Sequence, residues 1–206
     1  MASKNSHIEF PQCQIAKQQV WLNGELSFDY KEGTDFGAFA KAAYQQLGIK
    51  YPKFHKMDFL CKLGFLSFES LLTKIDSFEQ FNSEKIGFFI ANRYSSLETD
   101  DNYWATTQHE DGHPSPSLFV YTLPNIVIGE MCIRHKIKGE HSFFVFEEMD
   151  SEFICNYVMD LMQTNKLEAA VIGWLDSYHG EYRSNFVWVE ADTLRLQSIP
   201  SIKQLF

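Results

Sequence analysis

The spacing of apolar residues predicts helices in several parts of the chain. In segment 36–47 apolar side chains recur at i, i+3, i+4 and i+7, which is typical of an amphipathic helix. A longer stripe covers segment 57–75, and Gly64 on it indicates that a neighbouring element approaches closely. We expect a third helix over 124–136, with a proline in its first turn, and a fourth that is capped at 150–151.

Short runs rich in β-branched and aromatic residues predict strands between these helices. Segment 86–91 carries no charge and is too short for a helix, so we expect a strand buried on both faces, as in parallel sheets. Further strands are expected over 142–146, 169–175 and 185–189. The alternation indicates an α/β fold: a mostly parallel, five-stranded sheet with helices on both faces and right-handed crossovers.

Two polar segments are not expected to form regular structure. Segment 92–117 is rich in turn-forming residues and predicts a long loop. The first twelve residues are polar and are expected to be partly mobile. No repeat or linker interrupts the sequence, so we expect residues 1–206 to form a single domain.

The composition excludes several classes of protein. The 206 residues are 45% hydrophobic and 22% charged, which is typical of a globular chain and not of a disordered one. No stretch approaches 18 uncharged apolar residues, so we expect no membrane span. The net charge of −9 disfavours binding to nucleic acid. The four cysteines form no CxxC motif and follow no signal peptide, so we expect reduced thiols in a cytoplasmic protein.

One short motif matches the zinc-protease pattern H-E-x-x-H. It is the run His109-Glu110-Asp111-Gly112-His113. In that chemistry two imidazoles one helical turn apart bind the zinc ion, and the glutamate activates a water molecule. The glycine in this run and Pro114 interrupt the helix that the chemistry requires. We therefore interpret the motif as a solvated loop, and we expect no metal and no cofactor.

Other candidate groups have a simple structural interpretation beside the functional one. Cys61, Cys132 and Cys155 fall within predicted helices, where buried and unreactive thiols are expected. The acidic run 147–152 either caps a helix or supplies paired carboxylates for acid–base chemistry. A basic patch is either a solvated helix face or a docking site for an acidic partner, and it consists of Lys50, Lys53, His55, Lys56 and Lys62.

Several segments occur in an order that resembles a known family. Segment 116–139 has a proline-led loop, then the helix pattern L-x-N-x-x-x-G-x-x-x-I, then a Lys-Gly turn into a strand. Segment 86–98 and segment 167–176 match two further strands in order and spacing. Over about residues 52–176 the chain resembles the N-terminal half of the β-ketoacyl synthases, the condensing enzymes of fatty-acid and polyketide assembly. The resemblance implies a thiolase-like α/β half.

The sequence departs from this family at the catalytic positions. In active members the strand after the Lys-Gly turn ends in a nucleophilic cysteine at a helix N-terminus, which lowers the pKa of the thiol. Counting from Gly139 places that position at Glu148, within one residue, and the next cysteine is Cys155. The two catalytic histidines of the family have no counterpart after Phe186, and His179-Gly180 is no substitute. We therefore expect that the chain alone does not condense acyl groups.

The resemblance also implies two interaction surfaces. In the family, the strand that corresponds to residues 141–146 pairs antiparallel with its copy across a dimer axis. In a monomer this aromatic run would be an exposed sheet edge that is prone to aggregation. We therefore expect that it either pairs with another chain or is buried in the chain's own sheet. Lys53 and Lys56 lie where the family carries basic residues that receive the acidic acyl carrier protein. The predicted dimer strand consists of His141, Ser142, Phe143, Phe144, Val145 and Phe146.

Our leading hypothesis is a non-catalytic, ketosynthase-like accessory protein of fatty-acid or polyketide synthesis, comparable to a chain length factor. Its expected partners are a second copy or a full-length ketosynthase, together with an acyl carrier protein, and not nucleic acid or a membrane. A second hypothesis is a residual enzyme in which Glu148 assists decarboxylation of a malonyl thioester. A third is a stand-alone small-molecule binding protein, because a fold alone does not define a function.

Overall fold

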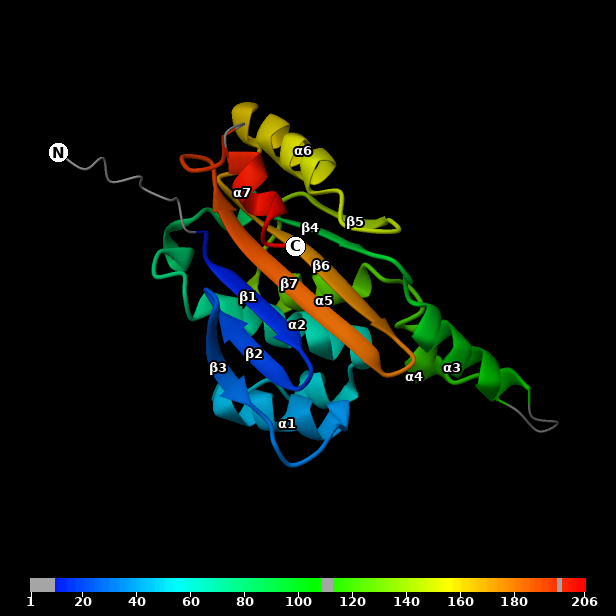
Figure 1. The fold of residues 1–206 in the computed structure, drawn as a ribbon. Helices are drawn as coiled ribbons and strands as arrows, with labels where there is room; N and C mark the ends of the chain where they lie inside the picture. Colours follow the sequence, from blue (N-terminus) through cyan, green and yellow to red (C-terminus); the bar gives the residue numbers. More distant parts are fainter. Residues whose placement is uncertain (1–9, 109–112, 196–197) are drawn as a thin grey trace.

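The computed structural model describes residues 10–108, 113–195 and 198–206, which form one mixed sheet with helices packed against it (Figure 1). The strand order is β3-β2-β1-β7-β6-β4-β5. β4 pairs in parallel with both β5 and β6, and the other neighbouring pairs are antiparallel. The strands are β1 (Gln12–Ala16), β2 (Gln19–Leu22), β3 (Glu25–Asp29), β4 (Ile86–Asn92), β5 (His141–Val145), β6 (Ala169–Tyr178) and β7 (Glu181–Glu190).

Aspartate side chains cap three of the longer helices. Asp35, Asp58 and Asp150 each accept a hydrogen bond from a backbone N–H in the first turn that follows, as N-cap residues typically do. The helices are α1 (Phe36–Gln46), α2 (Phe59–Leu72), α3 (Leu97–Thr107), α4 (Pro116–Phe119), α5 (Ile126–His135), α6 (Ser151–Gln163) and α7 (Ile199–Lys203). Short 3-10 turns lie at η1 (Pro52–Lys56), η2 (Phe78–Gln80) and η3 (Ser83–Lys85). The four helices predicted from apolar spacing are thereby confirmed as α1, α2, α5 and α6.

Helices cover both faces of the sheet, as the sequence predicts. Alternate residues of β4 face opposite layers: Phe88 and Ile90 pack with α1, α2 and α5, whereas Phe89 and Ala91 pack with α6 and α7. Every residue of β4 is buried, which confirms the prediction of a strand covered on both faces. No helix among the described residues is long and apolar enough to cross a membrane.

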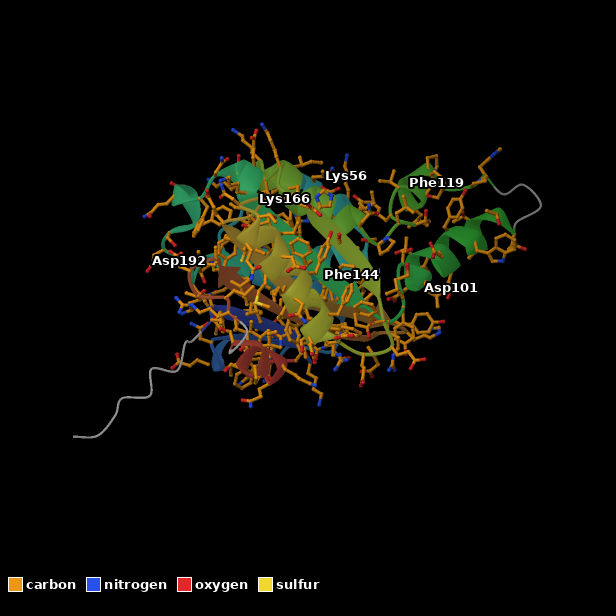
Figure 2. All side chains as sticks on the ribbon, turned by 90° about the horizontal axis from the view of Figure 1, so that it is seen from above. Lys56, Asp101, Phe119, Phe144, Lys166 and Asp192 are labelled. Atoms are coloured by element: carbon orange, nitrogen blue, oxygen red, sulfur yellow. The ribbon has the colours of Figure 1, made fainter. Side chains whose placement is uncertain are left out.

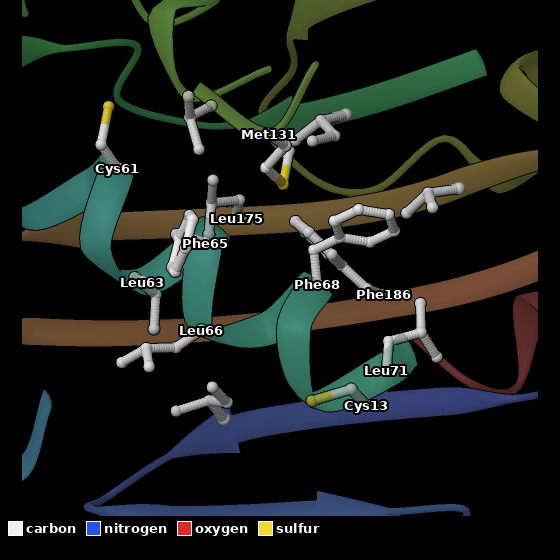
Figure 3. Close-up of a cluster of buried hydrophobic side chains, with 14 of the residues drawn as sticks. Cys13, Cys61, Leu63, Phe65, Leu66, Phe68, Leu71, Met131, Leu175 and Phe186 are labelled. Carbon is white, nitrogen blue, oxygen red and sulfur yellow. The ribbon is translucent and has the colours of Figure 1, made fainter. Parts of the chain in front are cut away.

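The larger core lies between α2 and the sheet. Figure 3 shows Leu66, Phe68 and Leu71 of α2 in one cluster with Phe186 of β7 and Cys13 of β1.

Gly64 lies at the closest approach of α2 to its neighbours. A Cβ atom there would come 2.4 Å from Cγ2 of Val127 on α5 and 2.9 Å from Cδ2 of Leu175 on β6. The close approach predicted at Gly64 is therefore confirmed, and glycine is the residue that fits.

The sheet differs from the prediction in strand number and direction. The α/β class holds, but the sheet is mixed and has seven strands instead of being mostly parallel with five. The segment Gln12–Asp29 adds an antiparallel meander of three short strands. β6 and β7 form a hairpin because His179 and Gly180, which join them, both have positive φ, the backbone of a two-residue hairpin turn.

Two segments predicted to be irregular are partly ordered. Segment 92–117 is not a long loop, because it contains α3 and the start of α4. Of the first twelve residues, 1–9 lie outside the described part of the chain, whereas Phe10 is buried and Gln12 begins β1. That the whole chain forms a single domain stays a prediction.

Candidate functional site

The loop between β5 and α6 contains the position that the family resemblance assigns to a nucleophile. Glu148 lies exposed in this loop. Asp150 caps α6, and its Oδ1 accepts a hydrogen bond from the backbone N–H of Phe153 at 2.9 Å. Arg93, at the end of β4, donates from Nε to the carbonyl oxygen of Glu147 at 2.7 Å. The carboxyl ends of β4 and β5 are therefore joined, at the sheet edge where α/β proteins commonly bind ligands.

The end of β6 is tied to the same edge. The backbone N–H of Arg93 donates to Oδ1 of Asp176 at 3.3 Å. Burial raises the pKa of Asp176, and the hydrogen bond from Arg93 together with the charge of Arg183 offsets part of this increase. The guanidinium of Arg183 lies 5.3 Å from the centre of the Trp174 indole ring, a cation–π distance.

A cavity of about 990 Å³ opens beside the β5–α6 loop. Trp174 forms part of its wall, and the Nε1 of this tryptophan is buried without a hydrogen-bond partner among the described residues. Arg183 and Lys203 contribute positive charge to the wall. None of the described lining residues is a histidine or a cysteine. The acidic side chains in the wall are Glu147, Glu148, Asp150 and Glu152.

The cysteines are placed as buried thiols and not as nucleophiles of this cavity. Cys155 follows the loop but is fully buried in α6, and burial raises its pKa to about 12. Burial likewise raises the pKa of Cys132 on α5 to about 11, and it raises that of Cys61 on α2 well above its usual value. The predicted structural role of these three residues is confirmed for Cys61 and Cys155, and Cys132 is half-buried.

The sequence gives no local signal for much of the cavity wall. Its residues come from β1, β6, β7 and the segment after α7, which are far apart in the chain. The carbonyl oxygen of Leu205 accepts hydrogen bonds from the side-chain amides of Gln12, Gln14 and Asn185. Three amides on two strands therefore hold this last segment against the cavity, and only the fold brings them together.

β5 lies at an open edge of the sheet. It pairs with β4 on one side, and no described strand pairs with its other side. The Phe144 ring lies 5.5 Å from the Phe146 ring and 5.5 Å from the Phe153 ring, on the α6 face, whereas Phe143 packs on the opposite core. The side chains of the predicted dimer strand are thus partly covered by the chain itself, while its backbone edge remains free.

The orientation of the free backbone groups follows from one hydrogen bond. The N–H of Phe146 donates to the carbonyl oxygen of Asn92 on β4 at 2.9 Å. Successive N–H groups of a strand point to opposite sides. The N–H groups of Phe143 and Val145 therefore point away from β4, toward the open edge.

The two lysines predicted to receive a carrier protein differ in their surroundings. Lys53 Nζ lies 2.8 Å from Oε1 of Glu130, whose side chain is only 3% exposed. The hydrogen bond to Glu130 raises the pKa of Lys53. Lys56 is exposed and forms no ion pair within the described part of the chain. A docking role for either lysine stays a prediction, and Lys56 is the better placed of the two.

The zinc-protease pattern lies mostly outside the described residues, which omit 109–112. His113 is described, and it is exposed between α3 and α4. No group of three potential metal ligands is present among the described residues. The interpretation of this segment as a solvated loop stays a prediction.

No family model matches the sequence, and no curated protein matches it. Solved structures with the same fold are found. The ishigamide ketosynthase/chain length factor aligns with a TM-score of 0.61 at 14% identity, over 89% of this chain and 62% of that chain. A ketosynthase (ApeO) in complex with its chain length factor (ApeC), from Xenorhabdus doucetiae, aligns with a TM-score of 0.59 at 12% identity, over 87% and 76% of the two chains.

A third similar structure is AntDE:AntF, a type II polyketide synthase acyl-carrier protein in complex with its ketosynthase bound to the hexaketide. It aligns with a TM-score of 0.60 at 12% identity, over 93% of this chain and 63% of that chain. This chain spans less than two thirds of the first and third of these structures. The chain therefore has the thiolase-like fold of ketosynthases and chain length factors.

Proposed function

We propose that the protein is a non-catalytic, ketosynthase-like accessory subunit of polyketide or fatty-acid synthesis. In this proposal it acts as a chain length factor does, beside a condensing enzyme that supplies the nucleophile. The fold supports the proposal, because the similar structures include a ketosynthase in complex with its chain length factor. In this proposal it belongs to the members of the β-ketoacyl synthase-like family that lack the catalytic cysteine, and it works in the cytoplasm with an acyl carrier protein.

The free edge of β5 is the observation that carries the proposal. β5 ends the sheet, and the N–H groups of Phe143 and Val145 point outward from it. Main-chain hydrogen bonds to a strand of another chain would satisfy these groups and extend the sheet. We assign this edge to the ketosynthase partner.

The surroundings of Glu148 favour a non-catalytic role over a residual decarboxylase. A decarboxylase needs donors that stabilise the enolate left when carbon dioxide departs. In the cavity wall Glu148 is accompanied by Glu147, Asp150 and Glu152, and these four acidic side chains outnumber the two basic ones, Arg183 and Lys203, so the net charge opposes an enolate. No described lining residue is a histidine that would donate to it.

The test is affinity capture of the tagged protein from extracts of its source cells, with identification by mass spectrometry. Recovery of a full-length ketosynthase, in a complex that survives purification at equal stoichiometry, supports the proposal. Recovery of an acyl carrier protein that is lost in a Lys56→Glu variant would assign the carrier surface. A preparation in which no condensing enzyme or carrier protein accompanies the chain contradicts the proposal.

A further inference from the structure

The cavity beside the β5–α6 loop lies on the face of the sheet that α6 and α7 cover. Figure 2 looks onto this face and shows the two helices side by side over the strands. Trp174 of β6 lies in register with Asn185 of β7, which lies in register with Gln14 of β1. Residues in register share one face of a sheet, and all three line the cavity. An indole and two side-chain amides therefore form one row across three strands.

This row already binds a peptide group of the chain itself. The carbonyl oxygen of Leu205 accepts hydrogen bonds from the side-chain amides of Gln14 and Asn185. A side-chain amide carries both donors and an acceptor, as a backbone peptide group does. Leu205 and Phe206 line the cavity and leave a volume of about 990 Å³ beside them. The row is therefore suited to bind a further peptide group.

Trp174 adds a buried donor that has no acceptor. The residue is 3% exposed, and its Nε1 has no hydrogen-bond partner among the described residues. Buried N–H groups in proteins almost always have a partner, and leaving one unpaired costs stability. Because Trp174 lines the cavity, a ligand bound there can supply the missing acceptor. The indole and the two amides all favour a ligand with a carbonyl oxygen.

Charges of opposite sign line different parts of the cavity. The four acidic side chains lie within segment 147–152, in the β5–α6 loop and the first turn of α6. The two basic side chains are Arg183 on β7 and Lys203 on α7. None of these six takes part in an ion pair within the described part of the chain. β5 and β7 are three strands apart in the sheet, which corresponds to about 14 Å. Unpaired negative and positive charges are therefore separated across the cavity.

This charge pattern selects the class of ligand. A simple anion is repelled, because the acidic side chains outnumber the basic ones. A zwitterion with distant ends can place its ammonium group beside the acidic loop and its carboxylate beside Arg183 and Lys203. An α-amino acid carries both groups on one carbon atom, whereas a peptide separates them and has amide groups between them. Phe146 and Met149 supply apolar lining for the side chains of such a peptide.

We propose that this cavity binds a free short peptide with apolar side chains. The ammonium group of the peptide lies beside Glu147 and Glu148, and its carboxylate lies beside Arg183 and Lys203. Its central peptide group lies over the row that starts at Trp174 and accepts a hydrogen bond from it. This binding site is additional to the proposed function and does not depend on a ketosynthase partner.

Isothermal titration calorimetry of the purified full chain with the tripeptide Leu-Gly-Leu tests the site. We expect saturable binding with a dissociation constant on the order of 0.1 mM, because the charged side chains of the wall are exposed to solvent. The N-acetylated and the C-terminally amidated tripeptides should each bind at least about fivefold more weakly, since each lacks one charge-assisted contact. The amidated form is a cation, so attraction to the net negative cavity alone would make it bind more tightly.

Variants of the cavity wall assign each end of the peptide. Arg183→Met should weaken binding of the free tripeptide about fivefold and leave binding of the amidated form unchanged. The double variant Glu147→Gln/Glu148→Gln should weaken binding of the free tripeptide and leave binding of the N-acetylated form unchanged. Lys41→Met removes an exposed charge from α1, on the opposite face of the sheet, and should change neither. Circular dichroism of each variant confirms that the chain is folded.

Three results would overturn the peptide site: no saturable binding to the wild type, equal affinity for the free and the capped tripeptides, or equal effects of Arg183→Met and Lys41→Met. Equal affinity for the capped forms would show that the ends of the peptide are not recognised. None of these results bears on capture of a ketosynthase from cell extracts. Conversely, a site that distinguishes free from capped peptides stands even where no ketosynthase is captured, so the two proposals are tested separately.

Discussion

Lys53 Nζ lies 2.8 Å from Oε1 of Glu130, and the glutamate is buried while the lysine side chain is 45% exposed. The other carboxylate oxygen of Glu130 is buried without a hydrogen-bond partner among the described residues. The lysine is therefore the described partner that compensates this charge, which links η1 to α5. Lys53, which the sequence predicts to bind a carrier protein, therefore stabilises the fold of its own chain.

Lys53→Met should destabilise the protein because it leaves the carboxylate of Glu130 buried and uncompensated. Breaking a buried ion pair typically costs about 3–5 kcal/mol, and we expect about 2 kcal/mol here because water reaches the lysine. The free energy of unfolding in urea measures the loss. Lys56→Met, which removes an exposed lysine of the same turn, should change it by less than about 0.5 kcal/mol. Equal losses in the two variants would contradict the assignment.

Replacing each of two helical glycines by alanine should change the free energy of unfolding in opposite directions. Gly64→Ala places a Cβ atom 2.4 Å from Cγ2 of Val127, so α5 must move, and we expect a loss of about 2 kcal/mol from overpacking. A Cβ atom on Gly129 of α5 would meet no described atom within 4 Å, so Gly129→Ala should gain about 0.5–1 kcal/mol through helix propensity. Thermal and urea unfolding of both variants measure the difference, and a stabilising Gly64→Ala would contradict the close packing of α2 on α5.

The carboxylate of Glu69 should make stability depend on acid pH. Burial raises its pKa, but hydrogen bonds and charges from His135 and Arg134 outweigh burial, so the pKa lies below the usual 4.5. Glu69 therefore binds fewer protons in the folded than in the unfolded state near its usual pKa. Its contribution to stability is present above about pH 4.5 and is lost as the pH falls through the folded-state pKa.

Glu69→Gln should make the free energy of unfolding less dependent on pH in this acid range. The variant is expected to be less stable than the wild type at pH 7, and the gap should narrow as the pH falls below 4.5. Urea unfolding at a series of pH values measures both curves. A gap that stays constant down to acid pH would show that the ion pairs of Glu69 contribute nothing to stability.

The sequence predicts the elements that pack into the core and misses those that do not. Apolar residues recur with the helical period where one face of a helix is buried, so α2 and α6 can be identified from their apolar stripes. α3 buries only Thr99 and has no such stripe, which is why the sequence predicts a loop there. The prediction also misses the short strands of the first meander, although Asn23-Gly24, a typical hairpin turn, joins two of them.

The candidate site is predictable only where one segment builds it. The position of the β5–α6 loop follows from the order of the strand, the acidic run and the helix cap at Asp150. The cavity beside it also needs Trp174, Arg183 and Leu205, which lie on other elements. Their approach depends on the antiparallel hairpin of β6 and β7 and on β1, which the predicted parallel sheet does not contain.

Phe144→Asp is the obvious variant for testing the β5 edge, but it would not distinguish loss of pairing with a partner strand from loss of folding. The Phe144 side chain packs on Phe146 and Phe153 within its own chain, so an aspartate there disturbs the face under α6. The edge itself consists of backbone groups. A variant that removes one outward N–H and no core contact is therefore the sharper test.

Val145→Pro is that variant. The Val145 side chain is 54% exposed and its N–H points away from β4, so proline removes an outward donor while the β4–β5 ladder stays paired. Capture of a ketosynthase should fall at least about tenfold, because the lost hydrogen bond and the proline ring both oppose an added strand. Val145→Thr keeps the N–H and should capture the ketosynthase as the wild type does. Unchanged capture by the folded proline variant would show that the partner binds elsewhere, and β5 would then be no interface.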